Sequence, residues 1–360
     1  FSGIAGACAV TLFSFFIFTM QEPLAPLLLA ASRVDPASIG LILGISYFGS
    51  LFVPVPVAVL VRKYGYKAPL AVSAFILAGS YVALGLFPSV ATLLPGLFVI
   101  EAAKIALILG QQLQIGELSS TADSSSAFGW YSASVYTGQM LGPIASGFLL
   151  DRTGASFVWI AMASVMAAVA ADLYGILPGP PGGRRHENTA DPEGRGGRRI
   201  EFRVNPTGIL TPVAGAAVFA SFVLVLAIGV RMTFYPVFLA ASFMGTSIGV
   251  LIGLRSLGAI GARFLLASFI RICGGRVRAL FGMSVILTAG LVLVPFGRSF
   301  TSQAANSLLF GVAVGIGTPL TMSLVTDHVH RSRKELSMAV RLTATQFGLF
   351  AGPLPLGPAA

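Results

Sequence analysis

Long, predominantly apolar runs of residues constrain the fold of this chain more than any other feature of its sequence. Residues 5–20, 68–86 and 213–230 are three of these runs, and a helix needs about 20 mostly apolar residues to cross a bilayer. Apolar residues make up 55% of the chain and charged residues only 10%, whereas a soluble domain carries about 25% charged residues. The sequence therefore predicts an all-α polytopic protein embedded in a lipid bilayer.

The runs are too long to be strands of a membrane barrel, because such strands alternate apolar and polar residues over about 10 positions. We therefore predict eleven helical spans, at 5–31, 38–61, 68–88, 93–116, 127–150, 156–177, 208–241, 247–270, 278–296, 303–326 and 336–360. The first run exceeds the roughly 7–15 residues of a signal-peptide core, so we expect it to be retained. Because the last span reaches the end of the chain and the first residue is Phe1, we expect a fragment that lacks a twelfth span.

The net charge of +10 is distributed in a way that indicates membrane topology and not binding to nucleic acid. Fifteen Lys and Arg residues fall in one alternating set of predicted loops, and three fall in the other set. Loops rich in Lys and Arg stay on the cytoplasmic side of a membrane. We therefore predict a multi-pass protein of the cell membrane (plasma or inner membrane) with a cytoplasmic N-terminus.

One segment, 179–206, interrupts the apolar pattern and is rich in Pro, Gly and Arg. It has no apolar period and predicts a flexible cytoplasmic linker. Contact with anionic lipid is the alternative, since each basic residue near such a surface contributes about 1 kcal/mol. The predicted organisation is an N-terminal six-helix bundle at 1–177, a linker at 178–207, and a C-terminal bundle at 208–360 with five helices.

The two predicted bundles repeat each other at an offset of about 210 residues. The segments "PLLLAAS" at 26–32 and "SIG" at 38–40 correspond to "PVFLAAS" at 236–242 and "SIG" at 247–249. The glycines that follow also correspond, Gly44 with Gly253 and Gly49 with Gly258. Six spans per half is an even number, so the repeat is parallel. Transporters built on repeats bind substrate near the midplane between the halves, and glycines at this spacing let helices approach closely.

The loop after the second span and its counterpart in the second half carry a recognisable motif. The segments "AVLVRKYGYK" at 58–67 and "ASFIRICGGR" at 267–276 resemble the major facilitator superfamily pattern G-x-L-x-D-R-x-G-R-R/K. The residues that fit are Lys63, Gly65 and Lys67 in the first copy and Gly274 and Arg276 in the second. The resemblance implies the fold of that family, with two six-helix halves related by a pseudo-twofold axis along the membrane normal.

Both copies of the motif depart from the family at one position. The motif Asp is replaced by Arg62 in the first copy and by Arg271 in the second. In the family this Asp takes part in a cytoplasmic gating latch. We therefore expect the latch to use other partners, such as Glu117 and Asp327 with neighbouring arginines.

The fifth span, "GQMLGPIASG" at 138–147, is similar to the antiporter signature G-x-x-x-G-P-x-x-G-G of the same family. The matching residues are Gly138, Gly142, Pro143 and Gly147. Ser146 replaces one Gly. The signature is common among proton-coupled exporters of drugs and metabolites, so the resemblance favours export over uptake. A kink with a purely structural role is the alternative, because neighbouring groups satisfy the backbone that Pro frees.

Charged residues at predicted membrane depth are candidates for the substrate and proton site, because a charge there is costly unless it faces a cavity or a partner. At about 1.5 Å per residue, the site lies roughly 12 to 17 Å from the outer surface. Its predicted members are Glu22, Glu101, Lys104, Arg231 and Arg255. Polar and aromatic candidates for the cavity wall are Tyr131, Tyr136, Tyr235, Gln303, Asn306 and Gln346.

One of the two acidic residues has a possible cationic partner nearby in the sequence, and the other does not. Glu101 and Lys104 are three residues apart on one helical face, and a purely structural ion pair is the alternative to a role in transport. Glu22 has no cation within one turn, so its partner must come from another helix, and Arg231 is the expected one. A carboxylate in a low-dielectric cavity tends to bind a proton and a nearby cation opposes this. Movement of the cation would therefore load or release a proton.

These observations predict a secondary transporter that moves a small organic solute by alternating access, coupled to protons, with export favoured. Uptake of an organic anion by symport or facilitated diffusion is the alternative within this class, favoured by Arg231, Arg255 and Lys104. A non-transporting membrane sensor is a further alternative, although the segment at 179–206 is too short for a sensor domain.

An enzyme is not predicted, because no catalytic constellation falls at membrane depth. The three histidines, His186, His328 and His330, all fall in predicted loops, and the two cysteines make no disulfide framework. We therefore expect neither a metal nor a cofactor. The expected partners are a small-molecule substrate, protons and lipid, and the resemblance implies a monomer.

Overall fold

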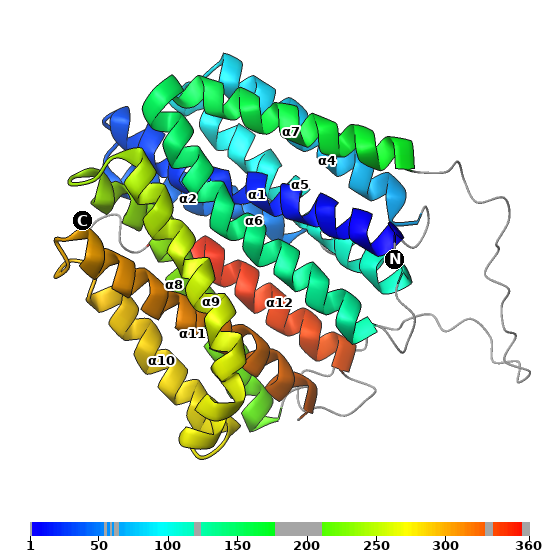
Figure 1. Ribbon diagram of the computed structural model, residues 1–360, viewed down its shortest axis with the longest axis vertical. Coiled ribbons are helices and arrows are strands. Elements are labelled where there is room, and N and C mark those ends of the chain that lie inside the picture. Colours follow the sequence, from blue (N-terminus) through cyan, green and yellow to red (C-terminus); the bar gives the residue numbers. More distant parts are fainter. Residues whose placement is uncertain are drawn as a thin grey trace, which may run out of the picture.

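The computed structural model describes residues 2–53, 56–57, 60, 65–118, 124–176, 211–327 and 334–354. Every regular element in these ranges is a helix (Figure 1), which confirms the predicted fold class. The N half, residues 2–176, contains α1 (Ser2–Ala31), α2 (Pro36–Leu51), α4 (Lys67–Leu86), α5 (Val90–Leu118), α6 (Ser124–Thr153) and α7 (Ala155–Ile176). The C half, residues 211–354, contains α8 (Pro212–Ala240), α9 (Gly245–Ile272), α10 (Arg276–Val292), α11 (Phe300–Asp327) and α12 (Lys334–Ala351).

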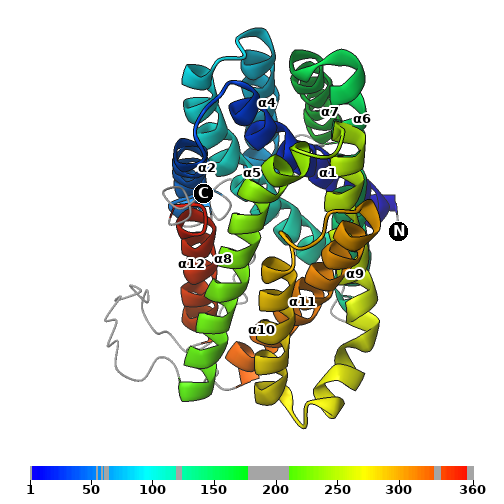
Figure 2. The ribbon, with the colours of Figure 1, turned by 90° about the vertical axis from the view of Figure 1, so that its left-hand side faces the viewer.

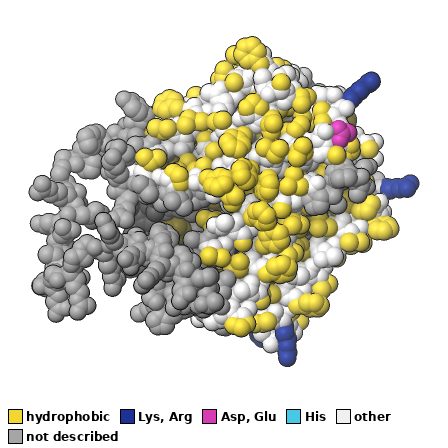
Figure 3. Space-filling model, turned by 180° about the vertical axis from the view of Figure 1, so that it is seen from behind, with side chains coloured by type: hydrophobic (Ala, Val, Ile, Leu, Met, Phe, Trp, Pro, Cys, Tyr) yellow, Lys and Arg dark blue, Asp and Glu magenta, His cyan; other side chains and the backbone are white. Residues whose placement is uncertain are grey.

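Seven of these helices are long and apolar enough to cross a membrane, judged by length and composition: α1, α4, α5, α7, α8, α9 and α11. Figure 3 shows hydrophobic side chains spread across the back of the molecule, with Lys and Arg at its edge. Large apolar side chains are exposed on the described surface, as Phe264 and Phe281 are, with 83% and 75% of their areas exposed. Soluble monomers rarely expose contiguous apolar patches of this kind, so the surface is suited to contact with lipid.

The second helix is shorter than its prediction, whose limits were 38–61. It begins with Pro36 after Asp35, whose carboxylate accepts a hydrogen bond from the Ser38 N–H at 2.9 Å and caps the helix. It ends at Leu51, where the sequence continues as "FVPVPV". Proline has no N–H to donate and disfavours helical conformation in the residue before it. Much of the remaining predicted span lies outside the described residues.

Each half is built around its own cluster of buried apolar side chains. In the N half, Trp159 of α7 stacks on Tyr81 of α4 with ring centroids 5.9 Å apart, and neither side chain is exposed. In the C half, Phe310 and Met283 are fully buried between α10 and α11. Figure 2 shows α8 and α12 of the C half side by side, next to α2 of the N half.

Glycines that correspond in the two sequences make corresponding helix contacts within the halves. A Cβ on Gly138 of α6 would lie 2.6 Å from the Leu12 carbonyl oxygen of α1. A Cβ on its counterpart, Gly348 of α12, would lie 2.8 Å from the Phe222 carbonyl oxygen of α8. Only a residue without a side chain allows backbones to approach this closely. The repeat that was read from the sequence is therefore present in the packing.

The same correspondence holds where the two halves meet. Gly40 of α2 touches the Pro353 carbonyl oxygen that follows α12, where a Cβ would lie 2.5 Å away. Its counterpart, Gly249 of α9, touches the Pro143 carbonyl oxygen of α6. The halves thus contact each other through α2 with α12 and through α6 with α9. The two ends of the bundle are named here by the direction of α1. The end where α1 begins is the basic end, and the opposite end, where α1 finishes at Ala31, is the far end.

A side chain of the N half caps a helix of the C half at the far end. Met244 precedes α9 and offers it no capping side chain. Instead, the Asp151 carboxylate of α6 accepts hydrogen bonds from the backbone N–H groups of Gly245 and Thr246 at 2.8 and 2.7 Å. The Thr246 hydroxyl donates a third, at 2.7 Å. A carboxylate in this place satisfies free helix donors and complements the helix dipole.

Candidate substrate-binding site

A central cavity of about 310 Å³ lies between the two halves. Its charged side chains, Glu22, Glu101 and Lys104, all come from the N half. The C half contributes an apolar wall, which consists of Val225, Ile228, Met232 and Leu349. Ligand pockets are typically apolar with a few placed polar groups and occupy about 300–1,000 Å³. The cavity has the composition and size of a binding site for a small organic molecule.

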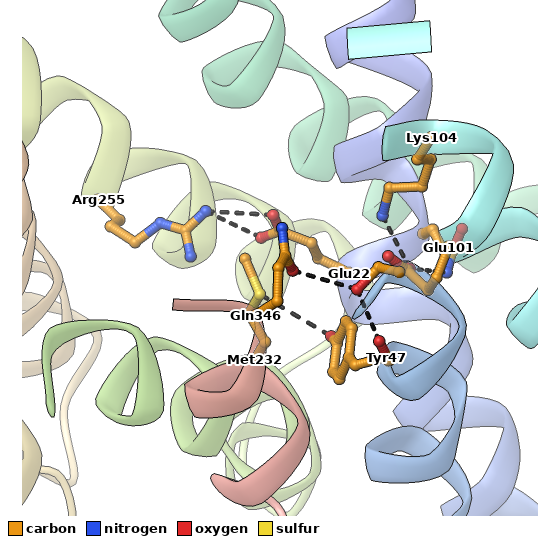
Figure 4. Close-up of polar contacts among 9 residues, drawn as sticks. Glu22, Tyr47, Glu101, Lys104, Met232, Arg255 and Gln346 are labelled. Atoms are coloured by element: carbon orange, nitrogen blue, oxygen red, sulfur yellow. Dashed lines mark hydrogen bonds and ion pairs between the residues drawn. The ribbon is translucent and has the colours of Figure 1, made fainter. Parts of the chain in front are cut away.

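Glu22 of α1 forms an ion pair with Arg255 of α9 across the two halves (Figure 4). The Arg255 Nη2 atom lies 3.0 and 3.2 Å from the two carboxylate oxygens. Only 11% of the Glu22 side chain and 10% of the Arg255 side chain are exposed. Of the ion pairs found among the described residues, this is the one that joins the halves.

Glu101 and Lys104 of α5 form a second ion pair, within the N half. The Lys104 ammonium lies 2.8 Å from Glu101 Oε1, and the Gln21 side chain of α1 donates to the same oxygen at 3.1 Å. The ammonium also lies 5.6 Å from the centre of the Phe18 ring. The sequence prediction of a local pair is therefore seen in the structure, and the pair lines the cavity.

Two polar contacts join the halves beside these ion pairs. The Tyr47 hydroxyl of α2 lies 4.0 Å from the Met232 sulfur of α8. The Ser50 hydroxyl of α2 donates to the Gln346 side chain of α12 at 3.1 Å. Figure 4 shows Tyr47, Met232 and Gln346 grouped around Glu22, with Arg255 approaching it from the other side.

Arg231 does not pair with Glu22, contrary to the sequence prediction. Arg231 is only 5% exposed. Its guanidinium donates hydrogen bonds to the Gly290 carbonyl at 3.0 Å, to the Asn306 side chain at 2.7 Å and to the Ser307 hydroxyl at 2.9 Å. The offset of about 210 residues explains the difference, because position 231 corresponds to Gln21. One residue turns a helix by about 100°, so Gln21 and Arg231 each point to the neighbouring helix of their own half. Met232, the counterpart of Glu22, faces the cavity instead.

Of the predicted wall residues, Tyr235, Gln303 and Asn306 belong to the same network as Arg231. The Tyr235 hydroxyl contacts Gln303 and Ser307 at 3.2 and 3.0 Å. Two others form contacts outside the cavity: Tyr136 accepts from Arg263 at 2.9 Å, and Tyr131 packs in a separate apolar cluster. The cavity residues that sequence reasoning missed, such as Tyr47 and Gln139, carry no charge to signal their depth.

The predicted gating residues lie near the basic end, in part outside the described residues. Arg62 and Lys63 are not described, and neither is the side chain of Glu117. Gly65 and Gly274 share a positive φ, of +78° and +72°. This left-handed conformation favours glycine, which accounts for the motif glycine in both copies.

The remaining gating residues lie at or near helix ends. Lys67 begins α4, and Arg271 lies in the last turn of α9. Arg276 forms an ion pair with Asp327, and about half of each side chain is exposed. Asp327 therefore has an arginine partner, as the sequence suggested. The pair joins α10 and α11 within the C half and does not bridge the halves.

The antiporter-like motif of α6 contacts two helices at once. Gly138 and Gly142 face α1, where Gly142 touches the Phe16 carbonyl and the Thr19 hydroxyl. Pro143 and Gly147 face α9, where Gly147 touches the Gly245 carbonyl. The motif thus packs one helix of each half against α6. No group of three or more His, Cys, Asp or Glu side chains that could hold a metal occurs in the described part of the chain.

Several solved structures resemble this one in fold. A bacterial homolog of the human lysosomal transporter Spinster, in inward-facing unoccupied and occupied conformations, aligns with a TM-score of 0.77. The sequence identity is 15% and 16%, and the alignments cover 99% of this chain and 81% and 80% of that one. The nucleoside transporter NupG aligns with a TM-score of 0.79 at 13% identity, covering 99% of this chain and 91% of that one.

The comparison with family sequence models identifies the family directly. No curated protein sequence matches the chain. The model of the Major Facilitator Superfamily, however, matches residues 7–353, which span both halves and every helix that lines the cavity. The chain therefore belongs to the Major Facilitator Superfamily.

Proposed function

We propose that this membrane transporter carries a small organic solute by alternating access and couples that movement to protons through Glu22. The observation that carries the proposal is the Glu22–Arg255 ion pair, which joins the two halves at the cavity. In transporters built on repeats, the halves rock against each other around a central site. Such rocking separates Arg255 from Glu22, and a carboxylate left without its cation at membrane depth binds a proton.

Export is the direction we propose, on the strength of the α6 motif. Gly138, Gly142, Pro143 and Gly147 match the exporter signature and pack α6 against α1 and α9. Uptake by symport or facilitated diffusion is the second candidate, since the ion pair itself does not favour a direction. We further propose a monomer in the cell membrane, with the N-terminus and the 178–207 linker in the cytoplasm.

The test is proton flux in liposomes that contain the purified protein and a trapped pH dye. Organic anions, organic cations and neutral solutes are added in turn, and solute movement is followed in parallel with label. We expect one class to drive proton movement, and Glu22→Gln to abolish it. Asp35→Asn, the same acid-to-amide change at an exposed loop, is the matched control and should transport normally. Unchanged proton flux in Glu22→Gln would refute coupling through this residue.

A further inference from the structure

We propose that the transported solute is an organic anion with an apolar body, and that Arg231 and Arg255 of the C half bind its acidic group. This inference rests on the proposed transport function but holds for either direction of transport. It names the chemical class of the substrate, which the fold leaves open, because solutes of opposite charge are carried by the same architecture.

The first argument is the balance of charge inside the bundle. Seven charged residues lie seven or more positions from both ends of their described helices: Glu22, Glu101, Lys104, Arg231, Arg255, Arg263 and Arg341. Five are cationic and two are acidic, so their net charge is +3 (5 − 2). Both acids are already paired with cations. The charged residues around the small pocket next to the cavity are Glu22, Arg231 and Arg255, with a net charge of +1 (2 − 1). An excess of one sign of charge attracts ligands of the opposite sign.

The second argument is the division of charge between the halves. Both carboxylates belong to the N half, whereas Arg231, Arg255, Arg263 and Arg341 all belong to the C half. Arg255 is neutralised by Glu22. Arg231, by contrast, has no carboxylate partner among the described side chains, although only 5% of its area is exposed. A charge held at membrane depth without a counter-charge is costly and typically marks a substrate path.

The third argument is the rigid support of the Arg231 guanidinium. Three hydrogen bonds hold it, and the rings of Tyr235 and Phe310 lie 4.1 and 4.5 Å from its central carbon. All of these partners are neutral. They fix the position of the cation and stabilise it by cation–π contact, but they leave its charge uncompensated. Such preorganisation favours a ligand that brings the missing negative charge.

The position of Arg231 connects it to the cavity. A small pocket of about 10 Å³, room for about one water molecule, lies among Glu22, Arg231 and Arg255. Met232 lines both this pocket and the central cavity, and its unbranched side chain moves more easily than other apolar residues. Displacement of Met232 would open a path from the apolar cavity to both guanidiniums. An acidic group would bind there while its apolar body occupied the cavity.

Equilibrium binding to the purified full chain in detergent tests this inference without requiring transport. The probes are 4-phenylbutyrate, 4-phenylbutylamine and 4-phenylbutanol, which share one apolar body and differ in charge. Titrations are done by calorimetry in chloride-free buffer, with protein-free micelles as blank. Because hydrogen bonds to charged groups contribute about 1.5–3 kcal/mol, we expect the carboxylate to bind about tenfold or more tighter than the alcohol. The amine should bind weakest.

Variants then test which residues are responsible for the preference for the carboxylate over the alcohol. Arg231→Gln and Arg255→Gln should each reduce the preference for carboxylate over alcohol about tenfold, while Arg298→Gln, the same change in an exposed loop, should leave it intact. If Arg231→Gln does not fold, the proposal is still tested by Arg255→Gln and by the binding of the three probes to the wild-type protein. Equal or absent binding of the three probes, tighter binding of the amine, or an unchanged preference in both cavity variants would overturn the proposal. Carboxylate binding without proton flux in liposomes would instead count against the proposed coupling alone.

Discussion

Glu22 and Arg255 lie on helices of opposite halves and bind each other at 3.0 Å, with about a tenth of each side chain exposed. The pair is therefore a contact between the halves in this structure, and its two charges must be accommodated if the halves separate. Breaking one partner of a buried pair leaves an uncompensated charge, whereas removing both partners does not. Removing one partner and removing both partners should therefore change the free energy of unfolding by different amounts.

Arg255→Gln should therefore destabilise the protein more than the double variant Glu22→Gln/Arg255→Gln. We expect the single change to cost up to about 3–5 kcal/mol and the double change markedly less. The free energy of unfolding, measured by titration with SDS in mixed micelles, checks this. A double variant that loses the sum of the two single losses would show that the pair has no coupling energy.

Gly249 of α9 should be intolerant of any side chain, because a Cβ there would overlap the Pro143 carbonyl oxygen of α6. We expect Gly249→Leu to separate α6 from α9 at the far end and to reduce transport at least tenfold, a loss of about 1.4 kcal/mol or more. Gly261→Leu is the control on the same helix, since its Cβ would meet nothing within 4 Å.

The readout for Gly249→Leu is access to the cavity from the far end. A single cysteine at Ser46, which lines the cavity, is introduced after Cys8 and Cys273 are replaced by serine. A membrane-impermeant maleimide is then added to the far side of vesicles of known orientation. Faster labelling in Gly249→Leu than in Gly261→Leu is expected, and equal rates would show that this contact does not close the far end.

The sequence predicted the helices well because the property that defines them is local. A run of about 20 apolar residues is sufficient to indicate a span, and each predicted span contains a helix. Most limits are close to those expected, although the last helix ends at Ala351, short of the predicted limit at 360, and residues 355–360 lie outside the described part of the chain. The second helix ends early because of a competing local signal, the prolines that follow Leu51. The repeat was also readable, since close backbone approach at positions such as Gly249 admits no other residue.

The sequence indicated which charged residues lie near the site, but not which of them bind each other. Charge at depth singled out Glu22 and Arg255, because such residues are rare in spans. Arg231 is not the partner of Glu22, because a similar depth along the helix does not fix the direction in which a side chain points. At an offset of 210 residues the counterpart of Glu22 is Met232, not Arg231. That Arg255 reaches Glu22 depends on how α9 packs against α1, which no local pattern records.

Asp151 should stabilise the contact between the halves at the far end, because it caps α9 of the C half from α6 of the N half. Loss of a capping side chain costs about 0.5–2 kcal/mol, and here the loss falls on the contact between the halves. Asp151→Ala should therefore raise maleimide labelling at position 46 from the far side several-fold. Asp35→Ala removes a cap within the N half and should leave that labelling unchanged. Equal increases in both variants would assign the effect to helix stability alone.

Asp327 should contribute little to holding the halves together, although the motif comparison places it at a gate. Its ion pair with Arg276 joins α10 to α11 in one half, and about half of each side chain is exposed. Exposed pairs contribute about 0–1 kcal/mol and are screened by salt. Asp327→Asn should therefore change the free energy of unfolding by less than about 1 kcal/mol, and that change should vanish in high salt. Transport should continue at close to the normal rate. A large loss of transport with normal stability would instead mean that Asp327 meets another partner when the halves move, and would restore it as part of the latch.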